Sequence, residues 1–73
     1  MPLRSLPYHE VRRKLEAAGF IVRSQKGSHV KFVRQTDQGI LTAIVPQHRE
    51  VAAGTLRSIL RQASISIDEW DRL

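Results

Sequence analysis

Three short segments with β-type sequence follow one another in the middle of the chain, and the connections between them are too short for a crossover. They are residues 20–23, which are aromatic and β-branched, residues 29–34, which alternate in polarity, and residues 40–45, which are largely apolar. Polar connections that contain glycine separate them, at residues 24–28 and 35–39. Parallel strands need a crossover of a dozen or more residues, so this spacing predicts an antiparallel meander.

Helical periodicity precedes the three predicted strands. Val11, Leu15 and Ala18 recur at spacings of four and three residues, which places them on one face of a helix. Gly19 is suited to end that helix in a left-handed conformation. The pattern predicts a helix over about residues 7–18.

A second helical stripe follows the strands, and a short segment comes after it. The stripe consists of four apolar residues, Leu56, Ile59, Leu60 and Ala63. Ser66 and Glu69 then have the spacing of a capping box, which predicts a last short helix that packs Trp70 onto the body. We expect an α+β fold of order α-β-β-β-α. Both helices should cover one face of a three-stranded antiparallel sheet and leave the other face open to a partner.

The charge of the chain indicates a polyanionic partner. Twelve Lys and Arg against seven Asp and Glu give a formal net charge of +5, and residues 1–63 alone carry eleven basic and four acidic side chains. So basic a surface on so small a chain is typical of nucleic-acid binding, although an acidic protein partner fits the same charge. Five basic residues together suggest a phosphate-binding stripe, although each one alone is more often a solvated charge: Lys26, Lys31, Arg34, Arg57 and Arg61.

Several classes of protein are disfavoured by what the sequence lacks. It has no cysteine, no apolar run near the roughly 20 residues of a membrane helix, and no signal-peptide pattern in residues 1–7. We therefore expect a cytoplasmic protein with no membrane contact. Histidines and carboxylates do not occur at metal-ligand spacing, so we expect neither a metal nor another cofactor.

His29 has the best setting for chemistry among the three histidines. It begins an alternating strand on the same face as Lys31 and opposite Val30, so its side chain should point outward. Imidazole titrates near neutral pH and can move a proton in ribose and phosphate chemistry, for which RNA supplies its own nucleophile. On spacing alone, the simpler interpretation is a polar residue at the start of a strand.

The neighbouring polar residues leave more than one interpretation. A Ser28–His29 dyad is not expected, because adjacent strand residues point to opposite faces. His48 is either a phosphate ligand or a solvated loop residue, and His9 is interpreted as exposed. Phe20 and Phe32 are predicted for the core, which disfavours a platform that stacks single-stranded bases.

Four segments of the chain, in order, resemble the HicA toxins: residues 10–20, 25–29, 45–48 and 54–63. The resemblance covers about residues 5–65, and the Lys-Gly-Ser-His and Gly-Thr-Leu-Arg-Ser-Ile-Leu stretches are specific when they occur together. It implies one HicA-like domain over residues 1–73. The core of this domain is expected at about residues 5–65, and an acidic C-terminal extension at residues 66–73.

The resemblance also implies a function. HicA proteins have a fold like that of double-stranded-RNA-binding domains, act as mRNA interferases, and are encoded with a HicB antitoxin that binds the toxin and blocks its site. The family's catalytic histidine belongs to its Gly-Ser-His motif, which here ends at His29. We therefore predict a metal-independent endoribonuclease with mRNA and a HicB-like antitoxin as partners. The predicted RNA-binding residues are Lys26, Gly27, Ser28, Lys31 and His48.

Two alternatives remain open from the sequence. The chain could be a non-catalytic RNA-binding module of the same fold, in which His29 only contacts RNA or supports the structure. It could also be a protein-interaction domain whose basic face serves an acidic partner. Cleavage of purified RNA separates the predicted enzyme from the first alternative, and salt-sensitive RNA binding separates it from the second.

Overall fold

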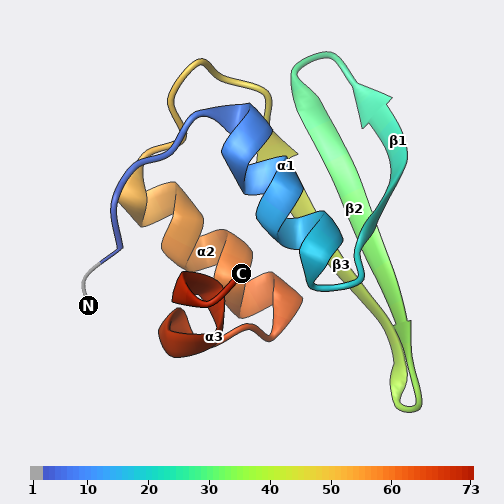
Figure 1. Cartoon of the computed structure of the whole chain (residues 1–73). Coiled ribbons are helices and arrows are strands. Elements are labelled where there is room, and N and C mark those ends of the chain that lie inside the picture. Colours follow the sequence, from blue (N-terminus) through green and yellow to red (C-terminus); the bar gives the residue numbers. More distant parts are fainter. Residues whose placement is uncertain (1–2) are drawn as a thin grey trace.

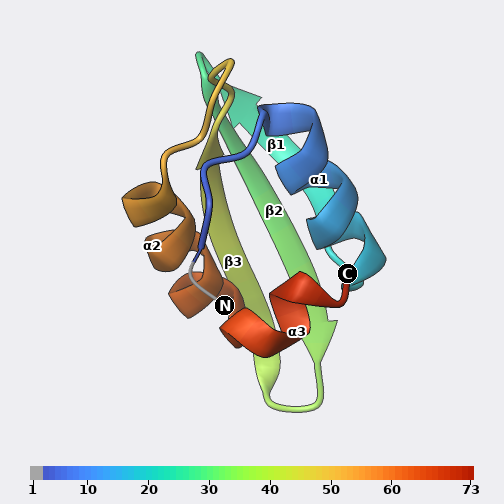
Figure 2. The ribbon, with the colours of Figure 1, turned by 60° about the vertical axis from the view of Figure 1, so that its left-hand side comes forward.

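The computed structural model describes residues 3–73, and its elements follow the predicted order. In chain order they are α1 (Tyr8–Ala17), β1 (Ile21–Lys26), β2 (His29–Thr36), β3 (Gly39–Pro46), α2 (Ala53–Ala63) and α3 (Ile67–Asp71). The strands form one antiparallel sheet in the order β1-β2-β3. Figures 1 and 2 show α1 and α2 on the same side of this sheet. The predicted α+β fold is confirmed, and the second face of the sheet carries no helix from residues 3–73; we call it the open face.

The strands are longer than the sequence predicted, because pairing with β2 draws polar residues into the sheet. Residues 24–26 were expected to belong to a connection, but they lie in β1, where Lys26 pairs with His29. Only Gly27 and Ser28 remain to make the turn. Gly27 has a φ of 59°, a left-handed conformation that glycine adopts without steric penalty and that suits the first position of a two-residue hairpin.

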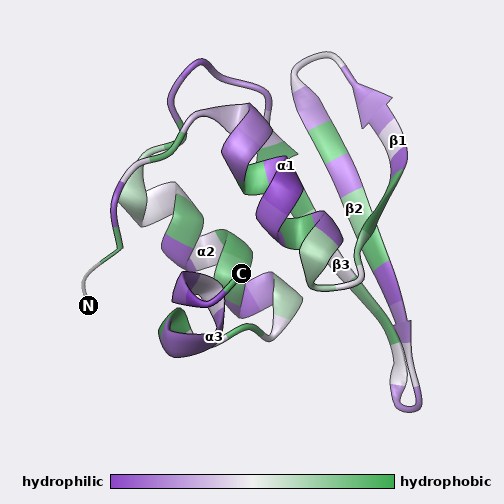
Figure 3. Ribbon diagram, in the orientation of Figure 1, coloured by the Kyte–Doolittle hydropathy of each residue, from purple (hydrophilic) through white to green (hydrophobic). Residues whose placement is uncertain are grey.

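The core lies between the helices and the closed face of the sheet. Val30 and Phe32 of β2 point toward the helices and are buried, and Figure 3 shows the alternation of hydrophilic and hydrophobic residues along this strand. All residues of the predicted stripe of α2 are buried beside them, as are Val11 and Leu15 of α1. Since this face supplies the core, the open face is free to carry other chemistry.

The C-terminal segment folds back onto α1. Ser66 Oγ accepts a hydrogen bond from the Glu69 N–H, and the Glu69 carboxylate accepts one from the Ser66 N–H, both at 3.1 Å. These two bonds form the predicted capping box. Hydrogen bonding to the Glu69 carboxylate, first from the Ser66 main chain and then from the Ser66 side chain, holds the pKa of Glu69 below its ordinary value. Trp70 is buried in the core, and Lys14 Nζ lies 5.3 Å from its ring centroid. Lys14 Nζ also donates to the main-chain oxygen of Trp70 at 2.7 Å, so α3 is held to α1.

Candidate functional site

The predicted site residues gather at one end of the sheet. There the β1–β2 turn lies near the loop that follows β3 and the start of α1, as Figures 1 and 2 show. Lys26 is directly opposite His29 in the sheet, and Lys31 follows two residues later on β2. Opposite residues of antiparallel strands have Cβ atoms about 4.5–5.5 Å apart on the same face. The three side chains are therefore neighbours on the open face, and all three are exposed.

The orientation predicted for His29 is confirmed. Its neighbour Val30 is buried against the helices, and His29 itself is exposed. Pro46 of β3 lies opposite His29 on the other side from Lys26. The imidazole thus occupies the central strand at the end of the open face, where a large ligand can reach it.

Two segments that are distant in sequence are joined beside His29 by hydrogen bonds. Gln25 Nε2 donates to Gln47 Oε1 at 2.7 Å, and the Gln47 N–H donates to the main-chain oxygen of Ser28 at 2.6 Å. These bonds attach the loop that carries His48 to the turn that precedes His29. The sequence analysis did not identify Gln25 and Gln47 as residues that build the site. The two side chains are 22 residues apart in the sequence, so no local pattern connects them.

Ser28 does not occupy the position on which the sequence argument relied. It lies in the turn between β1 and β2 rather than in a strand, so the alternation of strand residues does not determine where its side chain points. Its main-chain oxygen has a defined structural role, since it accepts the hydrogen bond from Gln47. The argument from strand alternation against a Ser28–His29 dyad therefore does not apply.

A shallow depression next to this end brings the other two histidines together. It is lined by two short segments, Pro7, Tyr8 and His9 with Gln47, His48 and Arg49. An antiparallel bridge between Leu6 and Val51 holds these segments side by side, with main-chain hydrogen bonds of 3.1 and 2.7 Å. His9 was interpreted as a merely exposed residue, and no spacing in the sequence indicates that it shares a surface with His48.

The predicted basic stripe is not continuous, and that prediction is wrong. Arg34 is on the helix-facing side of β2, where its Nε is 3.4 Å from the position that a Cβ on Gly19 would occupy. Arg57 and Arg61 are exposed on α2, in the layer of helices. Of the five predicted residues, only Lys26 and Lys31 adjoin His29, because Arg34 is on the other face of β2 and Arg57 and Arg61 lie on α2.

Two further properties concern the chain as far as it is described. Within residues 3–73, no three side chains of histidine, aspartate or glutamate gather closely enough to hold a metal ion. Over the same residues, no helix is both long and apolar enough to cross a membrane.

The fold and this end of the sheet define a small basic α+β protein with an exposed histidine between cationic neighbours. A family model described as HicA toxin of bacterial toxin-antitoxin matches residues 8–65. The chain therefore belongs to the HicA toxin family and is the toxin of a toxin–antitoxin system. In a comparison with individual curated proteins, none matches the chain.

Proposed function

We propose that this toxin is a metal-independent endoribonuclease that cleaves mRNA, with His29 as its catalytic residue. The observation that carries the proposal is the exposed position of His29 on the open face, directly opposite Lys26 and beside Lys31. An imidazole can accept or donate a proton and neighbouring cations attract a phosphate, which suits a reaction whose nucleophile belongs to the substrate. The resemblance to HicA toxins, which act as mRNA interferases, supports the same activity.

The reaction uses the 2′-hydroxyl of RNA. A bond forms between the 2′-oxygen and the adjacent phosphorus, and the bond from that phosphorus to the 5′-oxygen of the next nucleotide breaks. The 2′-oxygen loses a proton and the leaving 5′-oxygen gains one, which gives a 2′,3′-cyclic phosphate and a 5′-hydroxyl. His29 moves one of these protons, while Lys26 and Lys31 stabilise the negative charge that develops on the phosphate.

The remaining predicted residues hold the RNA backbone in this proposal. A Cβ on Gly27 would meet no atom within 4 Å, so the turn leaves room for a phosphate to approach the main chain. Ser28 is the second residue of that turn and His48 lies in the adjacent loop, and the hydrogen bond from the Gln47 N–H to the main-chain oxygen of Ser28 keeps the two segments together. Phe20, Phe32 and Trp70 are buried, which leaves Tyr8, beside His48, as the one aromatic side chain able to stack a base, and we expect weak sequence preference.

The first test compares His29→Ala with the wild-type protein on a defined RNA. We expect cleavage to fall by about 10²–10⁴-fold, the usual contribution of a general acid or base. His9→Ala, which removes another exposed histidine, is the matched control and should stay within about tenfold of wild type by the same estimate. Substituting the 2′-hydroxyl at the cleaved position should block the reaction, and EDTA should leave it unchanged.

Three results would contradict this proposal. Cleavage by His29→Ala at the wild-type rate would show that His29 is not the catalytic residue. Strong inhibition by EDTA would indicate a metal-dependent reaction. RNA that is retained by the wild-type protein without new 5′ ends supports the non-catalytic RNA-binding module instead. We further propose a HicB-like protein as the antitoxin partner, which co-purification of the two chains tests.

A further inference from the structure

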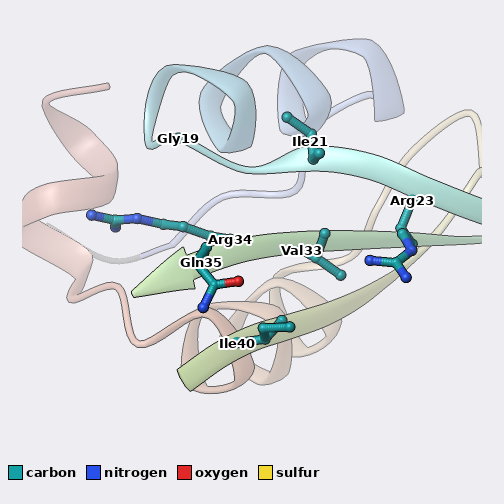
Figure 4. A pocket seen from close by; sticks show the side chains of 7 residues that line it. All are labelled: Gly19, Ile21, Arg23, Val33, Arg34, Gln35 and Ile40. Atoms are coloured by element: carbon teal, nitrogen blue, oxygen red, sulfur yellow. The ribbon is translucent and has the colours of Figure 1, made fainter. Parts of the chain in front are cut away.

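The open face becomes more strongly aliphatic away from His29, beyond Ile44, which lies directly opposite Lys31 and is 39% exposed. Ile21 is directly opposite Val33, and Ile40 lies on the third strand of the same face. The side chains of Ile21 and Ile40 are 62% and 57% exposed, whereas Val33 between them is only 8% exposed. Figure 4 shows the three residues around one shallow depression, which is also lined by Gln35 and by two arginines, Arg23 and Arg34. We call Ile21, Val33 and Ile40 the aliphatic patch.

A cation stands beside the aliphatic patch because β1 is irregular there. The register of β1 against β2 shifts between Val22 and Ser24, so Arg23 is the extra residue of a β-bulge. Bulges redirect a side chain and commonly occur at functional surfaces. Arg23 lines the depression, and Figure 4 shows its side chain extending from β1 toward β2. Within residues 3–73, the salt bridges are two pairs on α1, so Arg23 is not neutralised by a carboxylate of the described chain.

The chemistry of this surface favours a protein ligand over RNA. Exposed isoleucines gain little from phosphates and sugars, and no aromatic side chain is present on the patch to stack a base. A protein segment with aliphatic side chains removes Ile21 and Ile40 from water, which is the main favourable contribution to protein association.

Charge disfavours a second copy of the chain as the occupant. A symmetric dimer through this face brings Arg23 of both copies to one interface, on a protein of net charge +5. Like charges placed together oppose association, whereas a carboxylate next to Arg23 is complementary. The occupant that fits is therefore a protein segment that combines aliphatic and acidic side chains.

We propose that the aliphatic patch and Arg23 form the docking site of the antitoxin. This rests on the proposed partnership with a HicB-like antitoxin, and it assigns that partner to a surface away from His29. His29 and Val33 of the patch are four residues apart on β2, which corresponds to about 13 Å at about 3.3 Å per residue. Docking and catalysis thus use different ends of the open face.

The test measures the affinity of the toxin for the antitoxin encoded beside it. The double variant Ile21→Ser/Ile40→Ser should weaken binding by about 30-fold or more, and Arg23→Glu by about tenfold or more, in the range of central interface residues. Val22→Ser is the matched control for the first change, because Val22 is 36% exposed on the other face of β1. Arg57→Glu on α2 is the control for the second, with the same change in charge.

A second measurement does not depend on variants that stay folded. Isoleucine methyl groups of the wild-type toxin are labelled, and their NMR signals are followed as antitoxin is added. Signals from Ile21 and Ile40 should shift or broaden most, whereas the buried Ile59 and Ile65 serve as internal references. RNA cleavage by Ile21→Ser/Ile40→Ser should stay within about threefold of wild type, a change of under 1 kcal/mol.

Several outcomes would overturn the assignment of the docking site. The assignment is wrong if the affinity for the antitoxin stays within threefold of wild type in both Ile21→Ser/Ile40→Ser and Arg23→Glu. It is also wrong if the protein encoded beside the toxin does not bind the wild-type toxin. If the variants lose RNA binding but keep antitoxin binding, the patch is assigned to RNA instead. A wild-type dimer that separates on substitution assigns it to self-association. A loss of cleavage in His29→Ala without loss of antitoxin binding tests the proposed function separately.

Discussion

The two ends of the open face have different chemistry, although the same three strands build both. At one end, His29 lies between Lys26 and Pro46. At the other end, Val33 lies between Ile21 and Thr42. On the closed face, by contrast, Val30, Phe32, Ala43 and Val45 pack under the helices and form one core.

This contrast shows how a chain of 73 residues provides a fold and a working surface at once. The closed face supplies the core, so the residues of the open face are not needed to hold the sheet together. Alternation along a strand lets adjacent residues serve the two purposes independently. The open face is thereby divided into a histidine end, proposed for RNA cleavage, and an aliphatic end, proposed for antitoxin docking.

The largest effect is expected where both ends depend on the same buried residue. Phe32 is buried on the closed face of β2, between the two ends of the sheet. Phe32→Ala should destabilise the fold by about 3–5 kcal/mol. A domain of this size has a free energy of unfolding of only about 4–11 kcal/mol, so cleavage and antitoxin binding should be lost together on mild heating. Thermal denaturation by circular dichroism measures this. Gln35→Ala, exposed on the same strand, should change stability by less than about 0.5 kcal/mol.

A smaller effect should separate the ends by their response to salt. Lys26→Ala/Lys31→Ala removes two proposed phosphate contacts, so the slope of log affinity for uncleavable RNA against log salt should decrease by about 1.4. Arg57→Ala/Arg61→Ala removes the same charge from α2 and should leave the slope nearly unchanged. Equal slopes for the two double variants would mean that the whole basic surface, rather than the histidine end, binds RNA.

The turns at the two ends of the sheet offer a further comparison. Gly27 has a φ of 59° and Gly39 a φ of 124°, both unfavourable for alanine. Each Gly→Ala change should destabilise the protein by roughly 1–2 kcal/mol. Only Gly27→Ala should also lower the cleavage rate of the folded protein, because this turn positions His29. Cleavage assays below both melting temperatures test this, and equal losses would deny the turn a specific role.

The smallest effect concerns the acid dependence of α3. Hydrogen bonds from Ser66 lower the pKa of Glu69 in the folded protein below 4.5. The resulting stabilisation is fully present above the unfolded pKa and is lost as the pH falls through the folded pKa. Glu69→Gln should therefore flatten the fall in melting temperature below pH 4.5, which thermal denaturation at a series of pH values measures. Ser66→Ala should remove about 1 kcal/mol of stability at neutral pH.

Local sequence patterns predicted the fold well. Apolar periodicity located both long helices, short polar connections gave the antiparallel order, and Ser66 with Glu69 marked the start of α3. The strand ends were less accurate, because Ser24, Gln25 and Lys26 enter β1 through pairing with β2 rather than through their own preference. Strand formation by polar residues is a tertiary effect that local pattern does not record.

The site was predictable only as far as single strands determine it. The outward direction of His29 and its proximity to Lys31 follow from alternation along one strand. The link from Gln47 to Ser28 and the shared surface of His9 and His48 depend on contacts between distant segments, for which no local signal exists. The predicted stripe failed for the same reason, since charge on α2 and charge on the open face are indistinguishable in sequence.

Antiparallel pairing along β2 also sets a length requirement for inhibition. The central strand is held on both sides, so the separation between Val33 and His29, about 13 Å for four residues, cannot change without breaking the sheet. An antitoxin anchored on the aliphatic patch then needs at least four extended residues beyond its anchor to cover the imidazole. Shortening this extended segment of the antitoxin by a few residues should yield an antitoxin that still binds the toxin but no longer protects RNA from cleavage.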